Sequence, residues 1–193
     1  SISGGTSGVT LYKNVVDTTA MNGFNFGQRV TDGVNHSDLN IIDNTINQTG
    51  LMSSDGSTHA LYIQAQDFEI IGNTITGTRD GNAISVRSSG EVSCNTISGT
   101  SKADKPGIRY YSDHQVGISN QLLINGNKVR GSKSGINLFV PVDRYDGSTP
   151  NSHVVKNFTI TNNDVRGNDT PIVIDDRYQS SPFFLTISDN LIE

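Results

Sequence analysis

The chain has 193 residues, a formal net charge of −5, 33% hydrophobic residues, no tryptophan and one cysteine. The negative charge argues against a general attraction to nucleic acid or to an anionic membrane surface, and a single cysteine excludes an internal disulfide. No apolar run is long enough for a signal peptide or a membrane span, and the length suits one domain covering residues 1–193.

An octapeptide pattern occurs seven times along the chain. Each copy has an aliphatic residue at its third position, asparagine at its sixth and an aliphatic residue at its eighth. Alternating apolar and polar residues are typical of a strand, and we expect the asparagine to form a bend because it tolerates the left-handed backbone conformation. The copies are residues 9–16 (VTLYKNVV), 39–46 (LNIIDNTI), 68–75 (FEIIGNTI), 90–97 (GEVSCNTI), 122–129 (LLINGNKV), 158–165 (FTITNNDV) and 185–192 (LTISDNLI). Cys94 falls inside one copy, where it is expected to pack as a small residue of the stack.

A second series of short alternating segments lies between the copies. Each segment begins with a small residue or proline and then alternates apolar with variable residues, as a strand does. These segments are residues 23–28 (GFNFGQ), 60–65 (ALYIQA), 83–88 (AISVRS), 107–112 (GIRYYS), 135–140 (GINLFV) and 171–176 (PIVIDD).

The spacing of the repeats predicts the fold. Successive copies lie 22 to 36 residues apart, which signals a solenoid. Two strand series, a bend and a variable loop in each period describe a parallel β-helix, in which the repeated asparagines would stack as a hydrogen-bonded ladder: Asn14, Asn44, Asn73, Asn95, Asn127, Asn163 and Asn190. Because no amphipathic helix caps either end, we expect residues 1–193 to be a segment of a longer chain.

The outward positions of the second series gather aromatic, amide and guanidinium groups. Side chains of a strand alternate between its two faces, so the register predicts which residues share a surface. Rings pack on pyranose faces, amides bond hydroxyl groups, and arginine pairs with a carboxylate or a sulfate. The alternative is an ordinary solvated face with cross-strand pairs. The residues concerned are Tyr62, Gln64, Arg87, Arg109, Tyr111, Asn137 and Phe139. Long polar loops at 47–58, 98–106, 113–121 and 141–157 flank the strands and favour binding.

Two strands and one turn carry a resemblance to known enzymes. Residues 84–88 read ISVRS and residues 108–116 read IRYYSDHQV. The chain resembles the pectate-lyase-like superfamily, and these segments are similar to the alginate and chondroitin lyases of polysaccharide lyase family 6. The resemblance implies a single-stranded right-handed parallel β-helix of about seven coils. It also implies that Arg87 stands where the family has a lysine base and Arg109 where it has an arginine acid. Arginine holds its proton far more tightly than lysine, and Asn82 and Ser85 stand where the family has acidic calcium ligands.

The same turn is similar to the signature of mannuronan C5-epimerases through Tyr111, Asp113 and His114. Lyases and epimerases share a first step, in which a base removes the proton beside a uronate carboxylate. Arg87 or Arg109 could neutralise that carboxylate, with His114, His59 or Tyr111 as the base and Tyr111 or Tyr62 as the acid. The predicted catalytic residues are Arg87, Arg109, His114 and Tyr111, and the predicted substrate-binding residues are Tyr62, Gln64, Asn137, Phe139, Asp113 and His59.

Two classes of function follow from these observations. The first is an extracellular enzyme that acts on a uronate-containing polysaccharide by β-elimination or C5 epimerisation. The second is a carbohydrate-binding solenoid of the phage-tailspike or adhesin type, hydrolytic or non-catalytic, which as a tailspike would form a homotrimer. The expected partner is a polysaccharide, with no nucleic acid and no membrane insertion. No metal ligands are assigned, and calcium is left open as a cofactor.

Overall fold

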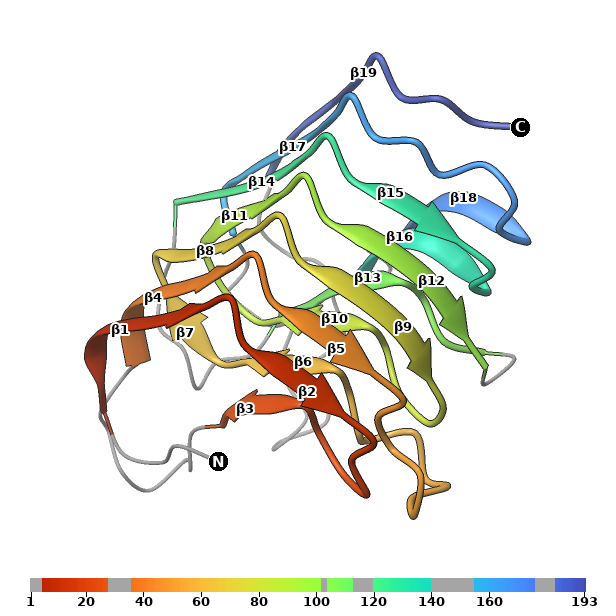
Figure 1. Cartoon of the computed structure of the whole chain (residues 1–193). Helices are drawn as coiled ribbons and strands as arrows, with labels where there is room; N and C mark the ends of the chain where they lie inside the picture. The colour runs from red at the N-terminus through yellow and green to blue at the C-terminus, as the bar shows by residue number, and fades with distance from the viewer. Residues whose placement is uncertain (1–4, 28–35, 102–103, 113–119, 140–154, 176–182) are drawn as a thin grey trace, which may run out of the picture.

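The computed structural model describes residues 5–27, 36–101, 104–112, 120–139, 155–175 and 183–193. Its elements are all strands, paired in parallel in three sheets. Strands of successive coils stack in order from the N-terminal coil, red in Figure 1, to the C-terminal coil, blue. The predicted all-β parallel solenoid is confirmed.

The eight-stranded sheet contains the first half of every octapeptide. Its strands pair in the order of the chain, and β7 adds to one side of β4. The strands are β1 (Ser7–Tyr12), β4 (His36–Ile42), β7 (Ala65–Gln66), β8 (Phe68–Ile71), β11 (Gly90–Ser93), β14 (Gln121–Asn125), β17 (Asn157–Thr161) and β19 (Phe184–Ser188).

The other two sheets complete each coil. The five-stranded sheet consists of β2 (Val15–Asp17), β5 (Thr45–Asn47), β9 (Thr74–Thr78), β12 (Thr96–Thr100) and β15 (Lys128–Arg130). The six-stranded sheet consists of β3 (Phe24–Phe26), β6 (Leu61–Ile63), β10 (Ile84–Val86), β13 (Ile108–Tyr111), β16 (Ser134–Phe139) and β18 (Thr170–Asp175).

The bend inside the octapeptide differs from the prediction. The copies expected to be single strands are divided between two sheets, as β8 and β9 show for residues 68–75. The left-handed residue is the one before each asparagine, with φ 54° at Asp43, 69° at Gly72 and 57° at Cys94. Cys94 is therefore exposed at the corner and does not pack in the stack. The asparagine itself is left free to turn its amide inward.

The predicted asparagine ladder is confirmed. The side-chain amide of each asparagine donates to the side-chain oxygen of the next, at 2.9 Å in all six steps from Asn14 to Asn190. The backbone N–H groups of Asn14 to Asn163 donate to the same oxygens. The five interior members are buried. Backbone amide groups that the corner would leave unpaired are thus satisfied inside the molecule.

The core is a set of aliphatic and aromatic columns. The register of the six-stranded sheet aligns Leu61, Ile84, Ile108 and Ile136, and a second inward column aligns Ile63, Val86, Tyr110 and Leu138. All eight side chains are buried, as the alternation predicts. Each coil therefore packs a narrow row of inward side chains against the rows of the neighbouring coils. This explains how a chain with 33% hydrophobic residues can form a continuous core.

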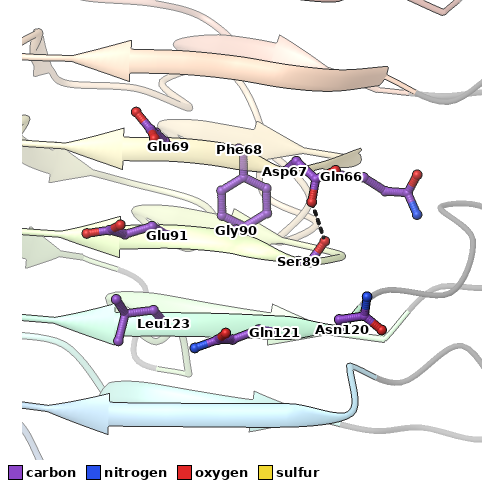
Figure 2. Close-up of a pocket in the computed structure, with 10 residues that line it drawn as sticks. All are labelled: Gln66, Asp67, Phe68, Glu69, Ser89, Gly90, Glu91, Asn120, Gln121 and Leu123. Atoms are coloured by element: carbon purple, nitrogen blue, oxygen red, sulfur yellow. Dashed lines mark hydrogen bonds between the residues drawn. The ribbon is translucent and has the colours of Figure 1, made fainter.

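Gly90 interrupts one inward column of the eight-stranded sheet. Its register partners are Phe68 and Leu122, and the Phe68 ring lies over it (Figure 2). Gly90 has φ 152°, and a Cβ there would meet the carbonyl oxygen and the ring of Phe68. The large ring on one coil fills the space that glycine leaves on the next.

Replacing Gly90 with alanine should lower the free energy of unfolding by about 2–4 kcal/mol, because the methyl group overlaps Phe68 and the backbone conformation disfavours any Cβ. Gly99→Ala is the matched control: it has φ 70°, and the nearest atom to its Cβ lies 3.8 Å away. In urea unfolding, the control should lose only the cost of placing a Cβ in the left-handed backbone conformation, about 1–2 kcal/mol. Equal losses would show that Phe68 moves aside without cost.

Within the described ranges the structure contains no helix capable of crossing a membrane.

Candidate functional site

The outer face of the six-stranded sheet carries the predicted surface residues. Strand pairing places Ser85 beside both Tyr62 and Arg109, and Arg109 beside Asn137. On the next outward column Tyr111 pairs with Phe139. The predicted register of this face is confirmed, so residues 23 to 28 positions apart in sequence lie side by side on adjacent coils.

Arginine side chains and aromatic rings alternate across these coils. The Arg87 guanidinium carbon lies 5.0 Å from the Tyr62 ring centroid and 4.4 Å from that of Tyr111. The Arg109 guanidinium carbon lies 5.5 Å from the Tyr111 centroid and 4.6 Å from that of Phe139. We call Tyr62, Arg87, Arg109, Tyr111 and Phe139 the arginine cluster. Each guanidinium is held between two rings by cation–π contacts.

The two guanidinium groups are short of hydrogen-bond partners. Arg87 is only 9% exposed, yet its buried Nε and Nη1 have no partner among the described residues, and neither does the buried Nε of Arg109. No described carboxylate forms an ion pair with either arginine. An unmade hydrogen bond from a buried charged group costs more than one from a neutral group. The face is therefore not an ordinary solvated sheet surface, since it presents buried donors for which the described part of the chain supplies no acceptor.

The electrostatics of the arginine cluster favour an anion. Burial lowers the pKa of Arg109, and the nearby positive charge of Arg87 lowers it further. Arginine still remains protonated near neutral pH. Two like charges held together in a partly buried site repel each other, and a bound anion would relieve that repulsion.

His59 stacks on Tyr62 at the edge of the arginine cluster, with ring centroids 5.5 Å apart. Its Nδ1 accepts the backbone N–H of Asn82 at 2.9 Å, so the proton of the neutral ring sits on Nε2. Burial, followed by the charges of Arg87, Lys105 and Arg109, lowers the His59 pKa to about 3. This geometry argues against His59 as a general base and leaves it as a neutral stacking group.

The other predicted site residues divide into two groups. Gln64 and Asn137 lie on the same outer face, 3% and 9% exposed. Asp113 and His114 lie outside the described residues. Among the residues that are described, no group of three or more histidine, cysteine or acidic side chains could hold a metal ion.

Ser85 is a residue of this face that the sequence-based site prediction missed. It is fully buried, its hydroxyl has no hydrogen-bond partner in the described part of the chain, and it lies between Tyr62 and Arg109 in the register. Beside the guanidinium N–H groups, this hydroxyl is a second kind of donor on the face that lacks a partner within the described ranges. The sequence could have indicated Ser85, because the alternation of the strand places it in the same outward column as Tyr62 and Arg109.

Asp80 anchors the long loop that leads to His59. Its carboxylate accepts hydrogen bonds from the backbone N–H of Gly56 at 2.9 Å and from the N–H and hydroxyl of Thr58 at 3.2 and 2.8 Å. Burial alone would raise the Asp80 pKa, but these hydrogen bonds outweigh it and hold the pKa well below the usual value of 3.8. A buried carboxylate thus fixes the loop beside the arginine cluster.

Asp80→Asn should lower the free energy of unfolding at pH 7 by about 1–3 kcal/mol, because an amide cannot accept every hydrogen bond that the carboxylate accepts. The folded state has the lower pKa, so the carboxylate stabilises the fold above about pH 4 and loses this effect as pH falls further. The difference between parent and variant, measured by urea unfolding from pH 3 to 7, should narrow below pH 4. A difference independent of pH would contradict the anchor role. Asp17→Asn, at an exposed position of β2, serves as the control.

Comparisons of the chain with protein-family models, with curated proteins and with solved structures give no match.

Proposed function

We propose that the protein binds an acidic polysaccharide on the outer face of the six-stranded sheet and cleaves it by β-elimination or epimerises it at C5. The observation that supports this most directly is the pairing of Arg87 and Arg109, both held between aromatic rings, with buried donors that find no acceptor among the residues the structure describes. Planar guanidinium groups bind carboxylates through paired hydrogen bonds. The rings offer flat apolar surfaces for pyranose faces.

The proposed reaction begins at the carbon beside a uronate carboxylate. A base removes the C5 proton, and negative charge moves onto the carboxylate, where guanidinium groups stabilise it. In β-elimination the C4–oxygen bond then breaks, a C4–C5 double bond forms, and an acid protonates the leaving oxygen. In epimerisation the proton returns to C5 from the opposite face.

Tyr111 is the described residue best placed to transfer a proton. Its ring lies against both guanidinium groups, so a carboxylate bound to them would lie near it. Arg87 suits carboxylate binding better than proton abstraction, since arginine does not give up its proton readily. His114 remains the predicted base on the adjoining segment. This division of roles is consistent with a place in the pectate-lyase-like superfamily, and a polysaccharide substrate would place the protein outside the cell.

A non-catalytic carbohydrate-binding solenoid, such as a tailspike or adhesin segment, is the second candidate. The state of His59 favours it, because the one described histidine beside the arginine cluster has its Nδ1 engaged by Asn82 and a pKa of about 3. The surface would then bind the acidic chain without removing a proton from it.

A panel of uronate polysaccharides separates these functions. Elimination produces unsaturated ends that absorb ultraviolet light, and epimerisation in D₂O introduces deuterium at C5. Binding by calorimetry without either signal would support the second candidate. A parent protein that binds no member of the panel would overturn both.

A further inference from the structure

A depression of about 550 Å³ lies on the eight-stranded sheet across β8, β11 and β14. Figure 2 shows Glu69, Glu91 and Leu123 on successive strands, with Asp67 and Ser89 joined by a hydrogen bond at one end and Gln121 on the same strand as Leu123. The depression is open to solvent and is not part of the arginine cluster. Its size suits a sugar residue or a short oligosaccharide.

The lining of the depression is polar and negative. Glu69 and Glu91 are register partners on adjacent strands, which stack about 4.8 Å apart. No described cation forms an ion pair with either of them. Carboxylates accept hydrogen bonds from pairs of hydroxyl groups, and the amide of Gln121 can both donate and accept. These groups suit an uncharged sugar and repel a uronate.

Along the chain, residues that line the depression come directly after residues of the outer face of the six-stranded sheet. Arg87 belongs to the cluster and Ser89 lines the depression, and on the preceding coil Gln64 and Gln66 are related in the same way. The chain bends at Ser88 and Ser89, where it passes from one sheet to the other, and two residues of chain span at most roughly 7 Å. One bound glycan can therefore contact both places, with a positive site and a negative site a short distance apart.

We infer that the ligand is a heteroglycan in which an acidic sugar binds the arginine cluster and a neighbouring uncharged sugar occupies the depression. This inference rests on the proposed function and adds a specificity to it: Glu69 and Glu91 disfavour an unbroken uronate polymer. The recognised feature is an anionic group flanked by a polyol, not high charge density.

Charge reversal in the depression tests this inference. The probes are oligogalacturonate, which is acidic at every residue, and two heteroglycans: hyaluronan oligosaccharide, which alternates glucuronate with N-acetylglucosamine, and glucuronoxylan oligosaccharide. In calorimetric titrations, Glu91→Lys should change the affinity ratio of heteroglycan to oligogalacturonate by about three- to tenfold in favour of oligogalacturonate. Glu69→Lys, at an exposed site, should act in the same direction. Asp17→Lys on β2 makes the same change in net charge far from the depression and should leave the ratio unchanged.

The outcomes distinguish this inference from the proposed function. If Arg109→Met abolishes binding of every acidic probe while Glu91→Lys behaves like Asp17→Lys, the heteroglycan inference is wrong and the proposed function stands. If Arg109→Met changes nothing, the proposed function fails and the inference fails with it. Calcium binding that is lost in Glu91→Gln would assign the depression to a cation and also overturn the inference.

Discussion

Arg87→Met should weaken binding of a uronate-containing oligosaccharide by roughly 10- to 150-fold while leaving the fold as stable or more stable. The affinity loss corresponds to about 1.5–3 kcal/mol, the usual contribution of hydrogen bonds to a charged group. Methionine keeps the apolar contact with the rings of Tyr62 and Tyr111, between which the guanidinium lies. It also removes two buried donors, Nε and Nη1, that have no partner within the described residues.

The stability measurement makes this prediction specific to a binding role. Arg87 is a buried charge with no ion partner among the described carboxylates. Replacing it with an apolar side chain of similar size relieves desolvation and repulsion from Arg109, so the free energy of unfolding should stay level or rise by about 1 kcal/mol. If Arg87 served mainly to stabilise the fold, its replacement would instead lower the free energy of unfolding. Calorimetric titration and urea unfolding on the same preparations measure the two quantities.

Three further variants control for charge and geometry. Arg79→Ala removes one positive charge at an exposed position away from the arginine cluster and should change affinity little. Arg109→Lys keeps the charge but loses the paired hydrogen bonds, so its affinity should fall between parent and Arg109→Met.

His114→Ala should slow turnover with little effect on affinity if His114 is the base. Unchanged binding in both Arg87→Met and Arg109→Met would place the ligand elsewhere.

Asn95→Leu should lower the free energy of unfolding by about 3–5 kcal/mol, because it breaks the ladder at its middle. The Asn95 side chain accepts hydrogen bonds from the backbone N–H and the amide of Asn73 and donates to the Ile70 carbonyl and to Asn127, all at 2.8–2.9 Å. Leucine leaves these buried partners unpaired. Neighbouring hydrogen bonds in such a network also polarise one another, so the loss extends beyond one coil.

Asn14→Leu is the matched control, since Asn14 belongs to the same ladder but is exposed at its end. Water can replace the hydrogen bonds that Asn14 makes, so we expect a loss of about 1 kcal/mol. Chemical denaturation of both variants measures the difference. Similar losses at the two positions would show that burial does not set the strength of the ladder.

The arrangement of the coils could be predicted from the sequence because it depends on a local pattern repeated at a regular spacing. Alternation assigned Ile84 inward and Arg109 outward, and the repeated asparagine aligned Asn73 with Asn95, because a solenoid makes each residue contact the equivalent residue of the next coil. The left-handed residue before the asparagine was missed. Asp43, Gly72 and Cys94 share no side-chain chemistry that would indicate one conformation.

The state of each outward side chain depended on contacts that no repeat encodes. Arg87 proved buried, with Nε and Nη1 lacking acceptors in the described ranges, because rings from the coils before and after it close over the guanidinium. His59 lost its suitability as a base because the backbone of Asn82, 23 residues later, occupies its Nδ1. The sequence by itself thus determined which residues share a face. Only the tertiary structure decided their burial, partners and charge, because these depend on neighbours brought together from different coils.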